Sequence, residues 1–179
     1  MIVSLIGYRG CGKSSVGPLL ADMLGCDCVD SDDRIESAAG KSIARIFEED
    51  GEPAFRQLET SVLDQLLKQT SGVIASGGGA ILAEINRTNM KSAGPVVWLH
   101  ASAEALASRI GGDQTSTARR PSLTGKSIQE EVADVLNARS PLYEECATIQ
   151  VETEGRLPID IAVEIFQQIR QATEPGDRR

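Results

Sequence analysis

Aromatic side chains are scarce in this sequence. Three Phe, two Tyr and one Trp make up 3% of the 179 residues, although 41% of the residues are hydrophobic. The core must therefore consist mainly of Val, Ile, Leu and Ala, a composition typical of parallel sheets covered by helices rather than of aromatic-rich β-sandwiches. The composition favours an α/β fold, and the length favours one domain with a sizeable core.

Positive charge is also in short supply. The chain has 18 Lys and Arg against 26 Asp and Glu, which leaves a formal net charge of -8. A protein whose main partner is nucleic acid needs a basic stripe that replaces phosphate counterions, and the pair Arg119-Arg120 is too short to be one. Nucleic acid is therefore disfavoured as a partner, whereas a small anion can still be bound where a few cations and backbone N–H groups converge.

Cysteine pairs with metal-site spacing and long apolar runs are missing as well. Cys26-x-Cys28 is not a C-x2-C pair, so we expect the four cysteines to be reduced thiols in an intracellular protein. No apolar run reaches the roughly 18 residues of a membrane span. The apolar start, residues 1–6, is too short for a signal peptide because Arg9 and Lys13 follow it at once. We therefore expect a cytoplasmic protein without a membrane partner.

Short apolar runs rich in β-branched residues alternate with stretches of helical period. The runs predict five strands, at residues 2–6, 28–30, 73–76, 96–100 and 148–151. The helical faces are carried by Val16, Leu19, Leu20, Met23 and Leu24; by Phe55, Leu58, Val62 and Leu66; by Leu106, Ala107 and Ile110 after the expected N-cap Ser102; by Val132, Val135 and Leu136 after a Ser127/Glu130 capping box; and by Leu157, Ile161, Ile165 and Ile169. Strands that alternate with helices predict a doubly wound parallel sheet.

Two stretches break this pattern. Residues 111–120 contain no large apolar side chain, and they begin with Gly111-Gly112 and end with two arginines. Such a stretch is either a surface loop or a lid that closes over phosphates, and the pattern alone leaves both open. The expected domain spans residues 1–171, with the candidate lid at about 111–124, and the tail 172–179 is expected to fray.

The segment Gly7-Tyr8-Arg9-Gly10-Cys11-Gly12-Lys13-Ser14 matches G-x-x-x-x-G-K-[ST] in full. It follows a predicted strand and precedes a predicted helix, which is the context that a phosphate-binding loop requires. The glycines let successive N–H groups point inward, Lys13 reaches the β- and γ-phosphates, and the Ser14 hydroxyl can ligate Mg²⁺. The segment therefore predicts a nucleotide site. Pro18, just inside the following helix, removes a donor and predicts a local kink or a shifted first turn.

The acid that supports Mg²⁺ in many nucleotide hydrolases is absent from its usual place. The strand at 73–76 ends in Gly77-Gly78-Gly79 instead. Asp30-Ser31-Asp32 offers two carboxylates on alternate positions, which point to the same side of an extended chain. One could support the metal and the other accept a proton; the alternative is an acidic turn that caps the helix at Ile35.

Three arginines, Arg56, Arg120 and Arg139, complete the set of candidate residues. Each of them alone is typical of a surface cation, but together with the features above they follow the order and spacing of the shikimate kinase family, which the sequence resembles. The matching pieces are residues 7–14, Asp30-Ser31-Asp32, Gly51-Glu52-Pro53-Ala54-Phe55-Arg56-Gln57-Leu58-Glu59, Gly77-Gly78-Gly79, Arg120-Pro121-Ser122-Leu123 and Arg139 ahead of Pro141-Leu142-Tyr143, within residues 1 to about 170. The resemblance implies a P-loop kinase fold of three α/β/α layers with a five-stranded parallel sheet and a mobile lid. It also implies transfer of the ATP γ-phosphate to the 3-hydroxyl of shikimate, with Mg²⁺, in aromatic amino-acid biosynthesis.

The resemblance also implies roles for individual residues on the acceptor side. Arg56 and Arg139 would hold the substrate carboxylate, which suits the planar fork of a guanidinium. Asp32 would bind the ring hydroxyls and act as base, and Gly78 would offer a backbone donor where a side chain would obstruct. Ser14 would ligate Mg²⁺ directly.

Further roles concern ATP and its metal. Asp30 would support Mg²⁺ through water, Lys13 and Arg120 would act in catalysis, and Arg109 and Arg156 would line the adenine side. The implied ATP-binding residues are Gly10, Cys11, Gly12, Lys13, Ser14, Ser15, Arg109, Arg120 and Arg156.

Some positions depart from the family, and some interpretations stay open. Ser122 replaces a leucine of the lid motif, Arg119 adjoins Arg120 and could share its role, and Pro18 replaces a residue that is often polar. A kinase with another small hydroxylated acid as acceptor, such as gluconate, and a nucleotide-binding regulatory module remain alternatives. His100 is expected to be a polar residue at a strand end, and the chain is expected to be a monomer.

Overall fold

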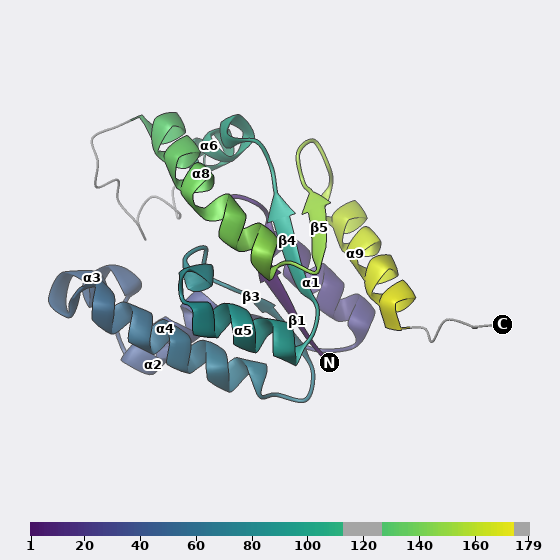
Figure 1. Cartoon of the computed structure of the whole chain (residues 1–179), viewed down its shortest axis with the longest axis horizontal. Helices are drawn as coiled ribbons and strands as arrows, with labels where there is room; N and C mark the ends of the chain where they lie inside the picture. Colours follow the sequence, from purple (N-terminus) through teal and green to yellow (C-terminus); the bar gives the residue numbers. More distant parts are fainter. Residues whose placement is uncertain (113–126, 174–179) are drawn as a thin grey trace.

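Five parallel strands form the centre of the structure, a computed structural model that describes residues 1–112 and 127–173 (Figure 1). The strands are β1 (Ile2–Ile6), β2 (Cys28–Asp30), β3 (Gly72–Ala75), β4 (Val96–His100) and β5 (Ile149–Glu152), in the order β2-β3-β1-β4-β5. Three of the five coincide with the predicted strands, and β3 and β5 are shifted by one residue. The predicted all-parallel sheet is confirmed.

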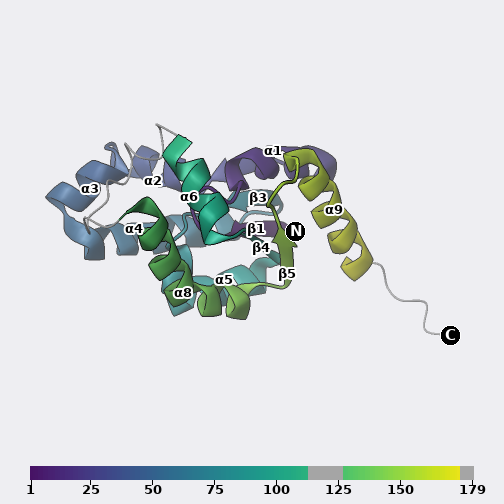
Figure 2. The ribbon, with the colours of Figure 1, turned by 90° about the horizontal axis from the view of Figure 1, so that it is seen from above.

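Helices cover both faces of this sheet, as Figures 1 and 2 show from two sides. They are α1 (Lys13–Leu24), α2 (Ser31–Ala39), α3 (Ile43–Glu49), α4 (Gly51–Leu67), the 3₁₀ turn η1 (Ala80–Leu82), α5 (Glu84–Ala93), α6 (Ala103–Gly112), α8 (Ile128–Cys146) and α9 (Pro158–Thr173). Because side chains alternate along a strand, Val3 and Leu5 of β1 pack with α1, α6 and α9, while Ile2 and Ile6 pack with α2, α4 and α5. The three-layer α/β/α architecture is confirmed.

The predicted helix caps are present. Ser127 accepts a hydrogen bond from the amide of Glu130, whose carboxylate accepts one in return from the Ser127 amide, so α8 begins with a capping box. Ser102 caps α6 through the amide of Ala105 at 3.1 Å. Helix α1 contains Pro18 and continues through it to a left-handed Gly25.

Two helices were not predicted from the sequence. Helix α3 has only seven residues, which is too short to display a helical period. Helix α5 buries only Asn86 and Met90 and exposes Ile85, so it has no continuous apolar stripe to recognise. No helix in the described parts of the chain is long and apolar enough to cross a bilayer.

The carboxyl ends of β1, β2 and β3 lie at one edge of the sheet, and each continues into a segment singled out above. Strand β1 leads into residues 7–14, β2 into Asp30-Ser31-Asp32, and β3 into Gly77-Gly78-Gly79. Ligands of open α/β sheets bind at this edge, so the topology brings the candidate residues together there. The candidate lid, with Arg119, Arg120 and Ser122, falls almost wholly on residues 113–126 and lies outside the described residues.

Candidate active site

The phosphate-binding loop adopts a backbone that depends on glycine. Gly7, Gly10 and Gly12 have φ of 141°, 79° and 101°, values that other residues rarely adopt, and a Cβ on Gly7 would collide with the carbonyl of Leu99. Lys13 donates from Nζ to the carbonyl oxygens of Gly7 at 2.8 Å and Tyr8 at 3.1 Å. The ammonium group is therefore held within the loop, in front of the N-terminus of α1.

The two carboxylate oxygens of Asp30 have different partners. One oxygen, Oδ1, accepts from the amide of Asp32 at 2.8 Å and caps α2, while Oδ2 accepts from the Ser14 hydroxyl at 3.5 Å. Burial, together with the charges of Asp32 and Asp33, raises the pKa of Asp30 above its ordinary value, although the amide bond and Lys13 oppose the shift. A divalent cation here would relieve the unfavourable charge.

The oxygens of Ser14 and Asp30 fit a magnesium ion. Mg²⁺ prefers oxygen ligands, keeps several waters, and usually takes one or two carboxylates together with substrate phosphates. No cluster of three or more metal-binding His, Cys, Asp or Glu side chains is found among the described residues. Two oxygen ligands leave positions for water and for substrate phosphates, as is usual where Mg²⁺ accompanies a nucleotide.

The glycine triplet after β3 is where three predicted acceptor-side residues meet. A Cβ on Gly77 would lie 2.6 Å from Oδ1 of Asp32, and a Cβ on Gly79 would lie 2.5 Å from Nη1 of Arg56. Between them, the carbonyl of Gly78 accepts from Nη1 of Arg139 at 3.1 Å. Each glycine thus adjoins one of the three side chains, and a side chain at 77 or 79 would displace it.

Arg56 is held from behind by two glutamates of its own helix. Its Nη1 donates to Glu59 at 2.7 Å, and Nε and Nη2 donate to Glu52 at 3.2 and 3.1 Å. Burial lowers the pKa of Arg56, but the bonds and charges of Glu59 and then Glu52 outweigh it, so the pKa lies above its ordinary value. Glu59 is only 2% exposed. Glu59 belongs to the sequence motif around Arg56, but the sequence predicted no role for it.

Gly78 is held between α8 and the phosphate-binding loop. Its carbonyl also accepts from the Tyr143 hydroxyl at 2.6 Å, and its Cα faces the loop, since a Cβ there would lie 3.4 Å from the carbonyl oxygen of Gly7. Within the described part of the chain, no group accepts a hydrogen bond from the amides of Gly78 or Gly79. These N–H groups are therefore available to an oxygen of a bound molecule.

The two arginines predicted for the adenine side lie in different surroundings. Arg109 of α6 donates to the Gly10 carbonyl at 3.1 Å and to Oγ1 and the carbonyl of Thr153 at 3.1 and 2.9 Å. It therefore ties the phosphate-binding loop to the end of β5. Arg156 instead donates to the carbonyl of Glu152 and to the carboxylate of Glu164 on α9. The structure brings Arg109 to the loop and leaves Arg156 in the turn before α9, paired with Glu164.

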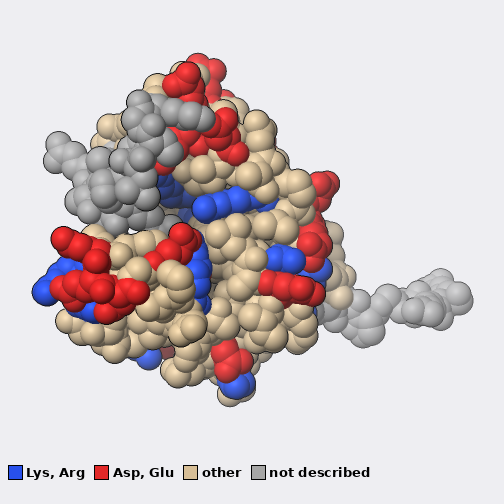
Figure 3. All heavy atoms as spheres, turned by 60° about the vertical axis from the view of Figure 1, so that its left-hand side comes forward, with Lys and Arg blue, Asp and Glu red and all other residues tan. Residues whose placement is uncertain are grey.

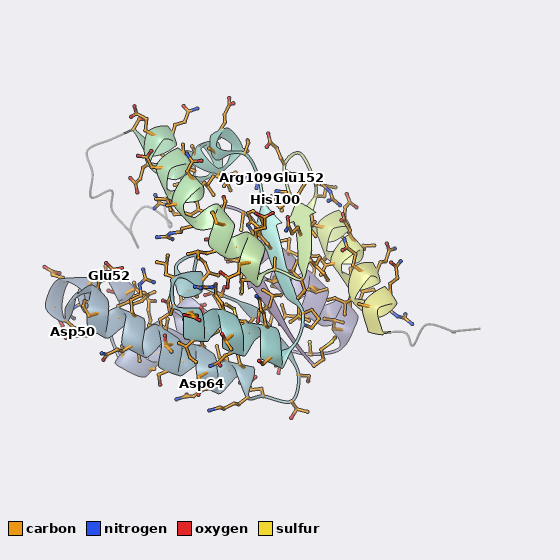
Figure 4. The ribbon with its side chains drawn as sticks, in the orientation of Figure 1. Asp50, Glu52, Asp64, His100, Arg109 and Glu152 are labelled. Atoms are coloured by element: carbon orange, nitrogen blue, oxygen red, sulfur yellow. The ribbon has the colours of Figure 1, made fainter. Side chains whose placement is uncertain are left out.

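His100 lies beside this corner of the molecule, near Arg109 and Glu152 in Figure 4. Its Nδ1 is 3.2 Å from a carboxylate oxygen of Glu152, and its ring centroid is 5.0 Å from that of Trp98. It also lines a small cavity of about 160 Å³ between β4, α6 and α8. These contacts agree with the expectation of a polar residue at a strand end.

The charges around the site differ from those of the whole chain. On the face drawn in Figure 3, Lys and Arg side chains gather in the hollow between the upper and lower parts of the molecule, and acidic side chains lie around its rims. A chain with a net charge of -8 thus still offers Lys and Arg side chains to a small anion in this hollow.

Comparisons with known proteins agree with this arrangement. The family model described as shikimate kinase matches residues 9–170. A shikimate kinase of Rhodopirellula baltica is 44% identical over 91% of this chain and 87% of its own length. A solved shikimate kinase of Acinetobacter baumannii, in complex with shikimate, superimposes with a TM-score of 0.90 at 37% identity over 97% of this chain and 95% of its own. A gluconokinase of Sinorhizobium meliloti, with a TM-score of 0.60 at 18% identity over 96% of this chain and 93% of its own, shares the fold alone. This chain belongs to the shikimate kinase family.

Proposed function

We propose that this protein transfers the γ-phosphoryl group of ATP to the 3-hydroxyl of shikimate, a step in the biosynthesis of aromatic amino acids. The observation that carries this proposal is the meeting of Asp32, Arg56 and Arg139 at Gly77-Gly78-Gly79, beside the phosphate-binding loop. One carboxylate and two guanidinium groups suit a small acid that carries hydroxyl groups. Membership in the shikimate kinase family supports the same acceptor.

On the acceptor side, Arg56 and Arg139 bind the carboxylate of shikimate. A guanidinium offers parallel N–H donors to the two oxygens of a carboxylate, and both arginines are already oriented by protein partners. Asp32 accepts from the ring hydroxyls and takes the proton of the attacking 3-hydroxyl. Gly78 contributes its amide, as a donor that no side chain obstructs.

On the nucleotide side, the phosphates lie in the loop, bound by Gly10, Cys11, Gly12, Lys13, Ser14 and Ser15. Arg109 adjoins the loop on the adenine side, and Arg156, whose guanidinium is paired with Glu164, is proposed for the same side. Arg120, outside the described residues, is proposed to meet the transferring phosphate.

Ser14 would hold Mg²⁺ directly and Asp30 would hold it through water. The ion supplies charge neutralisation at the phosphates. Phosphoryl transfer requires little covalent chemistry from a protein, so the work of these residues is to position the two substrates and to stabilise the charge.

The proposal is tested by ADP release from the purified protein with ATP and Mg²⁺, in parallel with shikimate, with gluconate and without acceptor. We expect ADP to be released only when shikimate is present, in an amount equal to that of the shikimate 3-phosphate formed. A folded protein that binds ATP but turns over no acceptor would indicate a regulatory module, and faster turnover of gluconate would indicate the other kinase.

Arg139→Ala tests the acceptor side of the site. Loss of a hydrogen-bonded charge should raise KM for shikimate by about 10- to 100-fold while KM for ATP changes little. Arg45→Ala, which removes an exposed arginine paired with Glu49, is the matched control. Equal increases in both KM values for Arg139→Ala would contradict the assignment.

We further propose that the enzyme acts as a monomer in the cytoplasm. Four free cysteines are consistent with a reducing compartment. Sedimentation at assay concentrations tests the oligomeric state, and a stable dimer would contradict it.

A further inference from the structure

The carbonyl of Gly78 accepts two hydrogen bonds from one face of α8. Arg139 donates at 3.1 Å and Tyr143 at 2.6 Å, and the two residues are one helical turn apart, so their side chains lie on the same side of the helix. The substrate carboxylate is the proposed ligand of Arg139. Tyr143 has no proposed contact with the substrate, and its hydroxyl donates to Gly78.

Tyr143 is held both through its ring and through its hydroxyl. Its side chain is fully buried, and its ring stacks on that of Trp98 with centroids 5.6 Å apart. Burial raises the pKa of the hydroxyl above its ordinary value, so it remains protonated and acts as a donor to the carbonyl. The ring thus holds a hydrogen-bond donor at a fixed point next to the site.

The orientation of one peptide group follows from this contact. In a trans peptide the C=O and the next N–H point in opposite directions, so a Gly78 carbonyl held toward α8 turns the amide of Gly79 away from α8. The Cα of Gly79 lies beside the Arg56 guanidinium, because a Cβ on Gly79 would lie 2.5 Å from Nη1. Glycine has no side chain to hold the turn in place, so the restraint must come from its neighbours.

We propose that Tyr143 is a positioning residue for acceptor binding: its hydroxyl holds the Gly78 carbonyl and thereby fixes the Gly78–Gly79 peptide and Arg139 in the arrangement that receives the carboxylate. This role rests on the proposed function. In this arrangement two residues of α8 act together: Arg139 binds the acid, and Tyr143 holds the backbone beside it.

Tyr143→Phe tests the role, because it removes only the hydroxyl and keeps the ring against Trp98. KM for shikimate should rise by about three- to tenfold, the effect of one hydrogen bond, while KM for ATP stays within about twofold. Amide hydrogen exchange in residues 77–79 of the free protein should become faster, most clearly at Gly77, whose N–H donates to the Ser31 hydroxyl at 2.9 Å. The double variant Tyr143→Phe, Arg139→Ala should raise KM for shikimate by less than the product of the two single effects, because both residues act on one carbonyl.

Thr148→Val is the matched control. It also removes a hydroxyl that donates to a backbone carbonyl, that of Val96 at 3.2 Å, but at the amino-terminal end of β4. It should lower thermal stability without changing either KM or the exchange of residues 77–79.

The outcomes separate the two proposals. An active wild-type enzyme whose two KM values rise equally in Tyr143→Phe, or whose exchange at 77–79 is unchanged, would overturn the role of Tyr143 and leave the function standing. A wild-type protein without shikimate turnover would overturn the proposed function and, with it, this role.

Discussion

Asp30 illustrates how one side chain can serve both the fold and the site. Its Oδ1 caps α2 and its Oδ2 faces Ser14, so neither of the two interpretations of the acidic turn excludes the other. Because burial raises its pKa, the ionised form opposes folding. The stability that Asp30 contributes is present below its unfolded pKa and is lost as the pH rises through its folded pKa.

Asp30→Asn should therefore separate the two tasks. Asn caps helices as well as Asp does, so the free energy of unfolding at pH 7 should be unchanged or higher, and the gain over wild type should shrink as the pH falls through the pKa of Asp30. The Mg²⁺ concentration for half-maximal velocity should increase severalfold. Urea unfolding at several pH values and a magnesium titration of activity measure these effects.

Asp64→Asn is a suitable control, since Asp64 lies in an exposed pair with Lys68. An unchanged magnesium dependence in Asp30→Asn would argue against metal binding, and a marked loss of stability at pH 7 would show that the charge is needed for the fold.

Glu59 shows what the sequence did not reveal at the residue scale. An ionisable side chain that is 2% exposed needs a partner, and Glu59 has one in Arg56 at 2.7 Å. In the sequence it is one acid three residues after an arginine, a spacing that also occurs on solvated helix surfaces. Only its burial distinguishes it.

At the scale of elements, the turn after β3 organises the acceptor side. Gly77-Gly78-Gly79 allows Asp32, Arg139 and Arg56 to approach the backbone from α2, α8 and α4. Helix α8 is far from α2 and α4 in the sequence, and side chains of all three helices adjoin this turn. The lack of side chains in the turn is what makes the meeting possible.

Gly77→Ala should disturb this meeting without unfolding the protein. The added methyl would lie 2.6 Å from Oδ1 of Asp32 and 3.2 Å from Glu59, so Asp32 must move. We expect kcat to fall by about 10- to 100-fold, in line with the effect of small displacements of catalytic groups. Steady-state kinetics and a thermal melt measure the two sides of the prediction.

Gly72→Ala, at the other end of β3, is the control because its new methyl would make ordinary contacts of 3.5 Å or more. A Gly77→Ala enzyme with the kcat of wild type would show that the close approach of Asp32 to the turn is not required.

At the scale of the molecule, the last helix completes one layer of the fold. The final buried side chain of α9 is Ile169, in the cluster with α1, and the structure describes α9 to Thr173. We therefore expect a chain that ends at residue 173 to keep kcat and both KM values within about twofold of the full chain. A chain that ends at 168 should unfold at a lower temperature, because it loses Ile169. Loss of activity on removing only residues 174–179 would contradict the assigned domain limits.

Much of this protein is determined by local sequence. The phosphate-binding loop is a contiguous motif, the strands are short apolar runs, and the cap pair Ser127 and Glu130 is a local signal, so each was recognisable without a structure. The lid expected at residues 113–126 and the role of Arg120 stay predictions. Helices α3 and α5 were missed because the first is short and the second polar, and tertiary packing rather than periodicity stabilises them.

Tertiary structure alone decided which distant residues meet. The bonds from Tyr143 and Arg139 to Gly78 span 65 and 61 positions, and the bond from Arg109 to Gly10 spans 99. Such contacts depend on strand order, sheet register and the packing of helices, and none of these is encoded in a local pattern. The sequence by itself therefore determined that a nucleotide is bound and which family the chain resembles. The folded chain decided how the acceptor side is built, because only packing brings three separate helices to one turn without side chains.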